Sequence, residues 1–249
     1  MSLVASSTGA LVKLKPFSSA EDAAKAGADF IFARATEALE LRDRFILALS
    51  GGSTPWQMLH KLAGYDLPWN KVHILQVDER AVPDDDPDRN LLHIRKVFAE
   101  PVSLPPDHLH AMPVVRADLN AGAQAYEREL AALAGTPPIA DVIQLGLGVD
   151  GHTASLVPDD PVLEICDRDV GVTGPYNGCP RMTLSYPFIN RARHIMWLIV
   201  GAEKAVMVER LIRKDRTIPA GRISSQQATI IADSAAMSAY ENDGVSKPC

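Results

Sequence analysis

The sequence lacks most features of secreted, membrane or metal-binding proteins. Its 249 residues include three cysteines, Cys166, Cys179 and Cys249, whose spacing matches no metal site and whose odd number leaves one thiol unpaired. This cysteine usage predicts a reducing, cytoplasmic compartment rather than a disulfide framework. Residues 1–12 lack a basic region followed by an apolar core, so we expect no signal peptide. No apolar run reaches the length of a membrane span, so we expect no membrane partner.

Positive charge is not concentrated anywhere along the chain. The formal net charge is −6, and no run of Lys or Arg forms a basic stripe, so we expect no nucleic-acid partner. An acidic protein that binds an anionic substrate must place positive charge locally, which makes individual Arg and Lys positions informative.

The overall composition is that of a globular protein. Hydrophobic residues make up 47% of the chain and charged residues 22%, which is ordinary for a folded domain. The length is sufficient for a full core. We therefore predict a single domain over residues 1–249, with its core at about 16–233 and a loose tail at about 241–249.

Strands and helices alternate along most of the chain. This order predicts an α/β fold with a doubly wound, mostly parallel sheet, helices on both faces, and antiparallel additions in the C-terminal part. The first strand is expected at an edge of the sheet, and the turn-rich residues 157–180 are expected to form an excursion or a lid. We predict strands over residues 11–16, 44–49, 71–77, 141–145, 181–186, 194–200 and 229–232, and helices over about 19–42, 56–63, 90–98, 118–134 and 202–213.

The segment after the predicted strand 141–145 contains several side chains that can take part in catalysis. Residues 146–155 read G-L-G-V-D-G-H-T-A-S, so that Asp150, His152, Thr153 and Ser155 follow closely on flexible glycines. A strand that leads into glycines and titratable side chains is typical of a site at the carboxyl edge of an open α/β sheet. The alternative is a polar turn whose histidine is only hydrogen-bonded.

A second strand end resembles a phosphate cradle. Residues 50–55 read S-G-G-S-T-P, and Pro55 suits the first turn of a helix. Backbone amides that converge at two glycines, together with hydroxyl groups and a helix dipole, favour a bound phosphate. The segment is not a P-loop, because Gly-Lys-Ser/Thr is absent, and a plain strand-to-helix turn is the alternative.

Charged residues mark two further loops. Asp78, Glu79 and Arg80 end the predicted strand 71–77, where a solvated strand end is the alternative, and Asn90 is expected to cap the next helix. Lys204 lies in the first turn of the predicted helix 202–213, where the helix dipole disfavours a cation unless an anion binds. A solvated lysine is the alternative there.

These motifs, in this order, resemble the 6-phosphogluconolactonase family, which belongs with glucosamine-6-phosphate deaminase to one superfamily. The resemblance spans roughly residues 16–233 and implies a Rossmann-like fold. It also implies hydrolysis of a sugar-phosphate lactone, 6-phospho-D-glucono-1,5-lactone, without a metal or an organic cofactor. We expect a monomer, with a homodimer as the alternative. The resemblance rests on residues 50–55, on 78–80 with Asn90, on 146–155, on R-M-T-L from Arg181 and on G-A-E-K-A from Gly201.

The resemblance implies a role for each motif. His152 is expected to activate water, Asp150 to orient the His152 ring, and Arg80 to donate to the developing oxyanion. We expect His152 at the start of a helix, whose dipole keeps the imidazole neutral. Asp78 is expected to accept hydrogen bonds from sugar hydroxyls, and Asn90 to shape the pocket. The phosphate is expected to bind Gly51, Gly52, Ser53, Thr54, Arg181 and Lys204.

Two other functions are considered. In the deaminases the histidine motif continues to a glutamate five residues later, which helps to open the sugar ring; here that position is Val157, which cannot exchange a proton. A non-catalytic sugar-phosphate sensor has no need to keep His152 with Asp78 and Arg80. The sequence also has V-P-D over residues 157–159 where Phe-Pro-Gly is common in the lactonases. Arg193 and Arg222 are expected to be solvated.

Overall fold

The computed structural model describes residues 2–4, 12–98, 102–224 and 226–240. Residue 11, the first of the predicted strand 11–16, and the predicted tail at 241–249 with Cys249 lie outside these residues.

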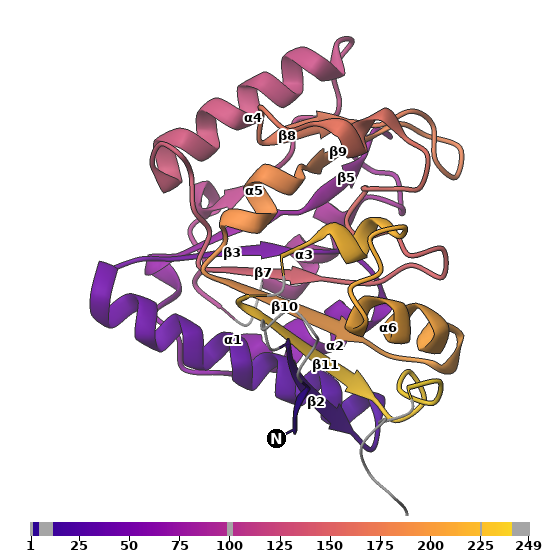
Figure 1. Ribbon diagram of the computed structural model, residues 1–249. Coiled ribbons are helices and arrows are strands. Elements are labelled where there is room, and N and C mark those ends of the chain that lie inside the picture. Colours follow the sequence, from indigo (N-terminus) through magenta and orange to yellow (C-terminus); the bar gives the residue numbers. More distant parts are fainter. Residues whose placement is uncertain (1, 5–11, 99–101, 225, 241–249) are drawn as a thin grey trace, which may run out of the picture.

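A large sheet runs through the middle of the described structure, in the order β1-β2-β11-β10-β7-β3-β4-β6 (Figure 1). Its pairings are parallel, except that β1 pairs antiparallel with β2. The predicted edge position of residues 11–16 is therefore wrong, because β1 covers that edge. The strands are β1 (Ser2–Val4), β2 (Val12–Phe17), β3 (Phe45–Leu49), β4 (Val72–Gln76), β6 (Leu109–His110), β7 (Val142–Leu145), β10 (His194–Ile199) and β11 (Ala228–Asp233).

Helices cover both faces of this sheet, which confirms the doubly wound prediction. One buried cluster joins the sheet to α1, α2 and α3, and a second joins it to α4, α5 and α6. The α-helices are α1 (Ala20–Arg42), α2 (Ser53–Ala63), α3 (Asn90–Phe98), α4 (Leu119–Ala134), α5 (Tyr186–Arg191) and α6 (Ala205–Ile212). Short 3-10 helices are η1 (Trp69–Lys71), η2 (Pro106–His108), η3 (Pro161–Glu164), η4 (Ala202–Lys204) and η5 (Pro219–Arg222).

Helix α1 shows how the sequence specifies these elements. Ser19 caps its start, because the Ser19 side chain accepts a hydrogen bond from the Asp22 backbone N–H, and Asp43 ends it in a left-handed conformation. Its buried face is made largely of small side chains, which lets the helix lie close to the sheet. Those residues are Ala23, Ala24, Gly27, Ala28, Ile31, Ala35 and Ala38.

The strand order reverses between β3 and β7. From β3 the chain proceeds outward through β4 to β6, and from β7 it proceeds the other way through β10 to β11. In open α/β sheets a crevice forms at such a switch point, outside the carboxyl ends of the strands. Both predicted glycine segments start there, because residues 50–55 follow β3 and residues 146–155 follow β7.

A smaller antiparallel sheet, β5-β9-β8, stands beside the large one and next to α4 (Figure 1). Its strands are β5 (Asp78–Arg80), β8 (Val170–Val172) and β9 (Arg181–Leu184). The antiparallel part is thus confirmed, but β5 comes from the N-terminal half. The sequence pattern predicts neither β8 nor α5, because both are short and flanked by turn residues. The predicted strand 181–186 ends at Leu184.

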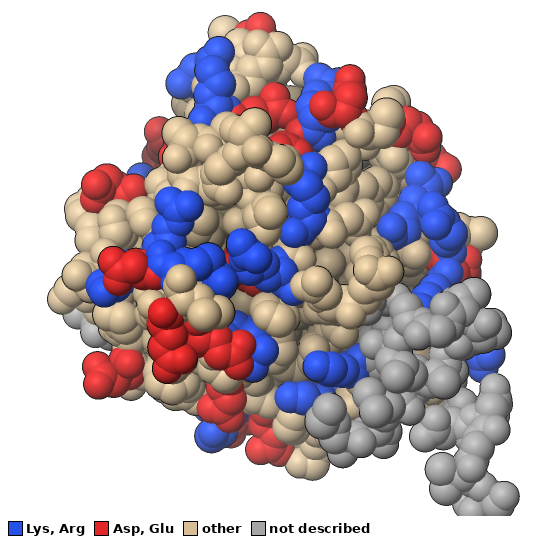
Figure 2. All heavy atoms as spheres, turned by 60° about the vertical axis from the view of Figure 1, so that its left-hand side comes forward, with Lys and Arg blue, Asp and Glu red and all other residues tan. Residues whose placement is uncertain are grey.

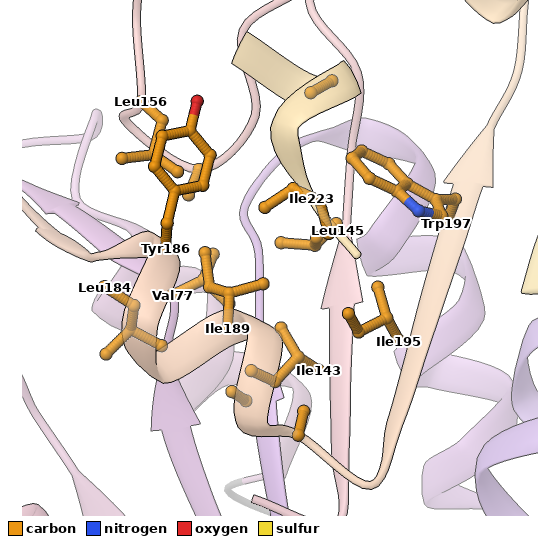
Figure 3. Packing of buried hydrophobic residues seen from close by; sticks show 14 of the residues in the cluster. Val77, Ile143, Leu145, Leu156, Leu184, Tyr186, Ile189, Ile195, Trp197 and Ile223 are labelled. Atoms are coloured by element: carbon orange, nitrogen blue, oxygen red, sulfur yellow. The ribbon is translucent and has the colours of Figure 1, made fainter. Parts of the chain in front are cut away.

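The loop after β7 is anchored in the core. Leu147, Ala154 and Leu156 are all at most 7% exposed and belong to the cluster under α4, α5 and α6. Figure 3 shows Leu156 near Tyr186, with Leu145 close to Ile223. The polar residues between Leu147 and Leu156 are therefore held on a rigid base.

No helix among the described residues is long and apolar enough to cross a membrane. On the face drawn in Figure 2, acidic and basic side chains are interspersed rather than separated by sign.

Candidate active site

Asp150 and His152 form a hydrogen-bonded pair. Asp150 Oδ1 lies 2.6 Å from His152 Nδ1 and also accepts the His152 backbone N–H at 3.1 Å. Gly148 makes this pairing possible, because a Cβ there would lie 2.0 Å from His152 Nδ1. With Nδ1–H donating to Asp150, the unprotonated Nε2 is available to accept a proton. Nε2 has no hydrogen bond to any described residue.

The surroundings keep Asp150 ionised. Partial burial alone would raise the pKa of this carboxyl group, but the hydrogen bonds from the backbone and ring of His152, and from Tyr176, lower the pKa below its ordinary value. The expected helix after His152 is absent: residues 153–156 form a turn closed by a Thr153–Leu156 bridge. The partner of the imidazole is therefore Asp150 and not a helix dipole.

Thr153 and Ser155 connect this loop to neighbouring strand ends. Thr153 Oγ1 donates to the Gly146 carbonyl at 2.9 Å, which closes the loop on itself. Ser155 Oγ donates to Asp78 Oδ2 at 2.6 Å, which joins the loop to β5. The two segments are 77 positions apart in sequence, and the fold brings them together at the same edge of the large sheet.

Asp78 lies deeper than the sequence suggested. It is 4% exposed, and burial raises the pKa of its carboxyl group, although the hydrogen bond from Ser155 and the charges of Arg80 and Arg181 act in the opposite direction. One oxygen already accepts from Ser155. The predicted contact of Asp78 with sugar hydroxyls therefore depends on its other oxygen.

A buried ion pair supports Asp78 and Asn90. Glu79 is fully buried, and its carboxylate lies 3.2 Å from Arg89 Nε; Arg89 is 2% exposed. The solvated strand end considered for this run is therefore wrong. The expected cap is also corrected: Glu79, and not the Asn90 side chain, accepts the backbone N–H groups of Asn90 and Leu91 at the start of α3.

Asn90 instead links the turn after β3 to β5. Its Nδ2 donates to the Asp78 carbonyl at 3.1 Å, and a Cβ on Gly51 would lie 1.9 Å from its Oδ1. Only glycine therefore fits at Gly51. Gly52 has a φ of 120°, a conformation that L side chains rarely adopt.

The start of α2 is open to an anion. The helix begins at Ser53, earlier than predicted, so that Ser53 and Thr54 lie in its first turn. Its N-cap residue, Gly52, makes no side-chain capping bond, and the first turn has no acidic residue. The first N–H groups of α2 have no capping partner among the described residues, and together with the positive end of the helix dipole they favour an anion.

Arg181 and Tyr176 complete the described cluster. Arg181 is 7% exposed, and its guanidinium carbon lies 4.9 Å from the centre of the Tyr176 ring. Tyr176 OH lies 2.9 Å from Asp150 Oδ2 and 3.3 Å from His152 Nδ1. The sequence motifs do not include Tyr176; its only sequence signal is the following Asn177-Gly178, a pair typical of tight hairpin turns.

The remaining candidates lie apart from this cluster. Lys204 ends η4 beyond β10, at the same sheet edge, and has no hydrogen bond to the other candidates among the described residues. Arg193 pairs with Asp141 at 3.2 Å, at the opposite, amino end of the strands, and Arg222 pairs with Glu164 at 3.1 Å. Within the described ranges, no three His, Cys, Asp or Glu side chains are arranged to hold a metal ion.

Fold and site together define a doubly wound α/β protein with an Asp–His pair at the switch point and cationic groups beside it. The chain belongs to the family described as glucosamine-6-phosphate isomerases/6-phosphogluconolactonase, whose model matches residues 18–232. The 6-phosphogluconolactonase of Synechocystis sp. is 45% identical over 175 residues, which cover 69% of this chain and 72% of that protein.

Solved structures of other proteins share the fold of this chain. A 6-phosphogluconolactonase from Trypanosoma cruzi superposes with a TM-score of 0.83 at 26% identity, over 92% of this chain and 97% of that one. A monomeric glucosamine-6-phosphate deaminase superposes with a TM-score of 0.80 at 20% identity, over 92% of this chain and 100% of that one. The fold alone therefore does not separate the two activities, and the site residues have to do so.

Proposed function

We propose that this chain hydrolyses 6-phospho-D-glucono-1,5-lactone to 6-phosphogluconate, the reaction that the names of its lactonase relatives imply. The observation that carries the proposal is the Asp150–His152 pair, with its free Nε2, at the switch point of the sheet. The substrate is a small molecule, and we propose that the enzyme acts as a monomer, with a homodimer as the alternative.

In the proposed reaction, His152 Nε2 takes a proton from water while the water oxygen attacks the lactone carbonyl carbon. Asp150 stabilises the positive charge that then develops on the imidazole. The carbonyl oxygen becomes negative, and Arg80 donates to it. The ring C–O bond breaks next, and the proton returns from His152 to the leaving alkoxide. The product is the open-chain acid, and His152 is neutral again.

The other end of the substrate carries the phosphate dianion. We assign it to the backbone N–H groups and hydroxyls at Gly51, Gly52, Ser53 and Thr54, at the open start of α2. Arg181 and Lys204 supply full positive charge, since backbone amides alone compensate a dianion poorly. Asp78 and Asn90 shape the wall of the site between the two ends.

The residue at position 157 favours the lactonase over a deaminase. Val157 is 3% exposed and carries no proton-exchanging group. Ring opening of an amino sugar phosphate therefore lacks a participant that lactone hydrolysis does not need. A sensor is disfavoured because it has no need for the hydrogen bond that joins Asp150 to His152.

The decisive experiment uses freshly generated lactone, because this substrate also hydrolyses spontaneously. Proton release in weak buffer is followed for the wild type and for His152→Ala. We expect His152→Ala to lower kcat by about 10²–10⁴-fold, toward the uncatalysed rate, while 6-phosphogluconate still binds.

His60→Ala is the matched control, because His60 is exposed on α2 away from the pair. It should retain the wild-type rate. A wild type that does not exceed the spontaneous rate rejects the proposed function, whereas an unchanged rate in His152→Ala rejects only the role of His152.

A further inference from the structure

Residues 173–180 form a hairpin that carries Tyr176 into the site. The Tyr176 backbone N–H donates to the Cys179 carbonyl at 3.0 Å, which closes a two-residue loop. Asn177 and Gly178 in that loop have φ values of 51° and 91°. Two consecutive positive φ values are typical of the type I′ turn, for which Asn-Gly is the preferred sequence. The turn therefore determines where the Tyr176 side chain projects.

The base of the hairpin is tied down on both sides. The Gly174 backbone N–H donates to Asp160 Oδ2 at 2.9 Å, which joins the hairpin to the segment that follows residues 146–155. The Arg181 backbone N–H donates to Thr173 Oγ1 at 3.1 Å, which joins the two strands where the hairpin starts. Tyr176 is thus held by a braced turn rather than by a loose loop.

The Tyr176 hydroxyl occupies the second oxygen of Asp150. His152 engages Oδ1 through both its ring and its backbone, and Tyr176 OH donates to Oδ2 at 2.9 Å. Burial, followed by the hydrogen bond to Asp150, raises the pKa of Tyr176, so the hydroxyl keeps its proton and donates at neutral pH. The Asp150 side chain is one-third exposed, and this contact on its second oxygen restricts its rotation.

The ring of Tyr176 contacts another residue of the site, Arg181. The Arg181 guanidinium lies over the ring at 4.9 Å, within the range of a cation–π contact. Two distinct parts of one side chain thus contact two parts of the site: the hydroxyl contacts the Asp150–His152 pair, and the ring face contacts a cation assigned to the phosphate.

We propose that Tyr176 is a positioning residue, whose hydroxyl orients Asp150 and through it the His152 ring, and whose ring orients Arg181. The proposal rests on the proposed function. It assigns one effect to the hydroxyl of Tyr176 and another to its ring. Loss of the hydroxyl should disturb the chemical step, whereas loss of the ring should also weaken binding of the phosphorylated substrate.

Three variants test this separation. Tyr176→Phe keeps the ring and should lower kcat about 5–20-fold with KM changed less than twofold, as expected for one lost hydrogen bond. Tyr176→Leu removes both parts and should lower kcat to the same extent and raise KM at least threefold. Tyr65→Phe is the control, because it removes a hydrogen bond of the same kind, from Tyr65 in the turn after α2 to Asp29 on α1. It should leave both constants unchanged.

A second measurement does not depend on turnover. The His152 Nδ1–H proton, observed by NMR, should exchange slowly with water in the wild type and in Tyr65→Phe, and faster in Tyr176→Phe. The proposal is overturned if exchange and kcat are the same in Tyr176→Phe as in the wild type, or if the wild-type proton already exchanges rapidly. If the wild type proves inactive on the lactone, the proposed function fails and the exchange rates alone decide the role of Tyr176.

Discussion

Arg80 and Arg181 are direct cross-strand neighbours in the antiparallel pair of β5 and β9. Like charges in this relationship destabilise a sheet unless other groups offset them. The Nε atoms of both side chains are buried and have no hydrogen-bond partner among the described residues. Asp78 interacts with both guanidinium groups but supplies at most one negative charge. We propose that a bound substrate offsets this repulsion, through its developing oxyanion at Arg80 and its phosphate at Arg181.

Removing the assigned phosphate-binding cations should weaken binding selectively. Arg181→Ala and Lys204→Ala should each reduce the affinity for 6-phosphogluconate by ~1.5–3 kcal/mol, since each removes a charge-assisted contact. Affinity for unphosphorylated gluconate should change little. Isothermal titration calorimetry with both ligands measures the difference, and Lys96→Ala, an exposed cation on α3, is the control. Equal losses for the two ligands would contradict the phosphate assignment.

The buried pair of Glu79 and Arg89 should matter for stability. Arg89→Met leaves the Glu79 carboxylate buried without its cation and should lower the free energy of unfolding by about 3–5 kcal/mol. Arg222→Met breaks a comparable Arg–Glu pair whose Glu164 side chain is 79% exposed, and should cost about 0–1 kcal/mol. Urea unfolding of both variants provides the comparison. Similar losses in the two would show that burial of the Glu79 pair has no special effect.

A histidine cluster should make stability depend on pH. Burial, followed by the charges of His108, His110 and Arg44, lowers the pKa of His73 from 6.5 to about 4. His73 therefore binds a proton more readily in the unfolded chain than in the folded one. The stability that depends on neutral His73 is fully present above about pH 6.5 and is lost as the pH falls toward 4. Because solvent screens this partly exposed group, we expect a loss of about 1–2 kcal/mol.

The contribution of His73 to this pH dependence can be tested by urea unfolding at about pH 7 and pH 4.5. The pH-dependent loss should be smaller in His73→Gln than in the wild type, because the substituted side chain does not titrate. His60→Gln, at an exposed histidine, should behave like the wild type. An identical loss in His73→Gln would show that His73 does not contribute.

Much of the fold was accessible from sequence because it depends on local patterns. The 3.6-residue period of α1 and the short apolar run at β7 are properties of contiguous residues, and the structure confirms both. Elements with little periodicity were missed, as β8 and α5 show. The start of α2 was misplaced because its first turn contains Pro55 and two hydroxyl residues, which also suit a loop.

The features of the candidate site also fall into those that local sequence predicts and those that it does not. The pairing of Asp150 with His152 was foreseen because the two residues lie in one loop, whereas their supposed helix was not found. Burial of Glu79 was not foreseen, because its partner Arg89 gives no local signal. Tyr176 was missed for a related reason: its contact with Asp150 spans 26 positions and depends on the turn at Asn177-Gly178.

The sequence by itself determined the fold class and the strand ends that carry chemistry, because glycines, hydroxyls and charged residues interrupt its apolar periodicity there. Only the tertiary structure decided which of these strand ends meet. The reversal of strand order between β3 and β7 joins segments that lie far apart along the chain, and such long-range packing leaves no pattern in either segment alone.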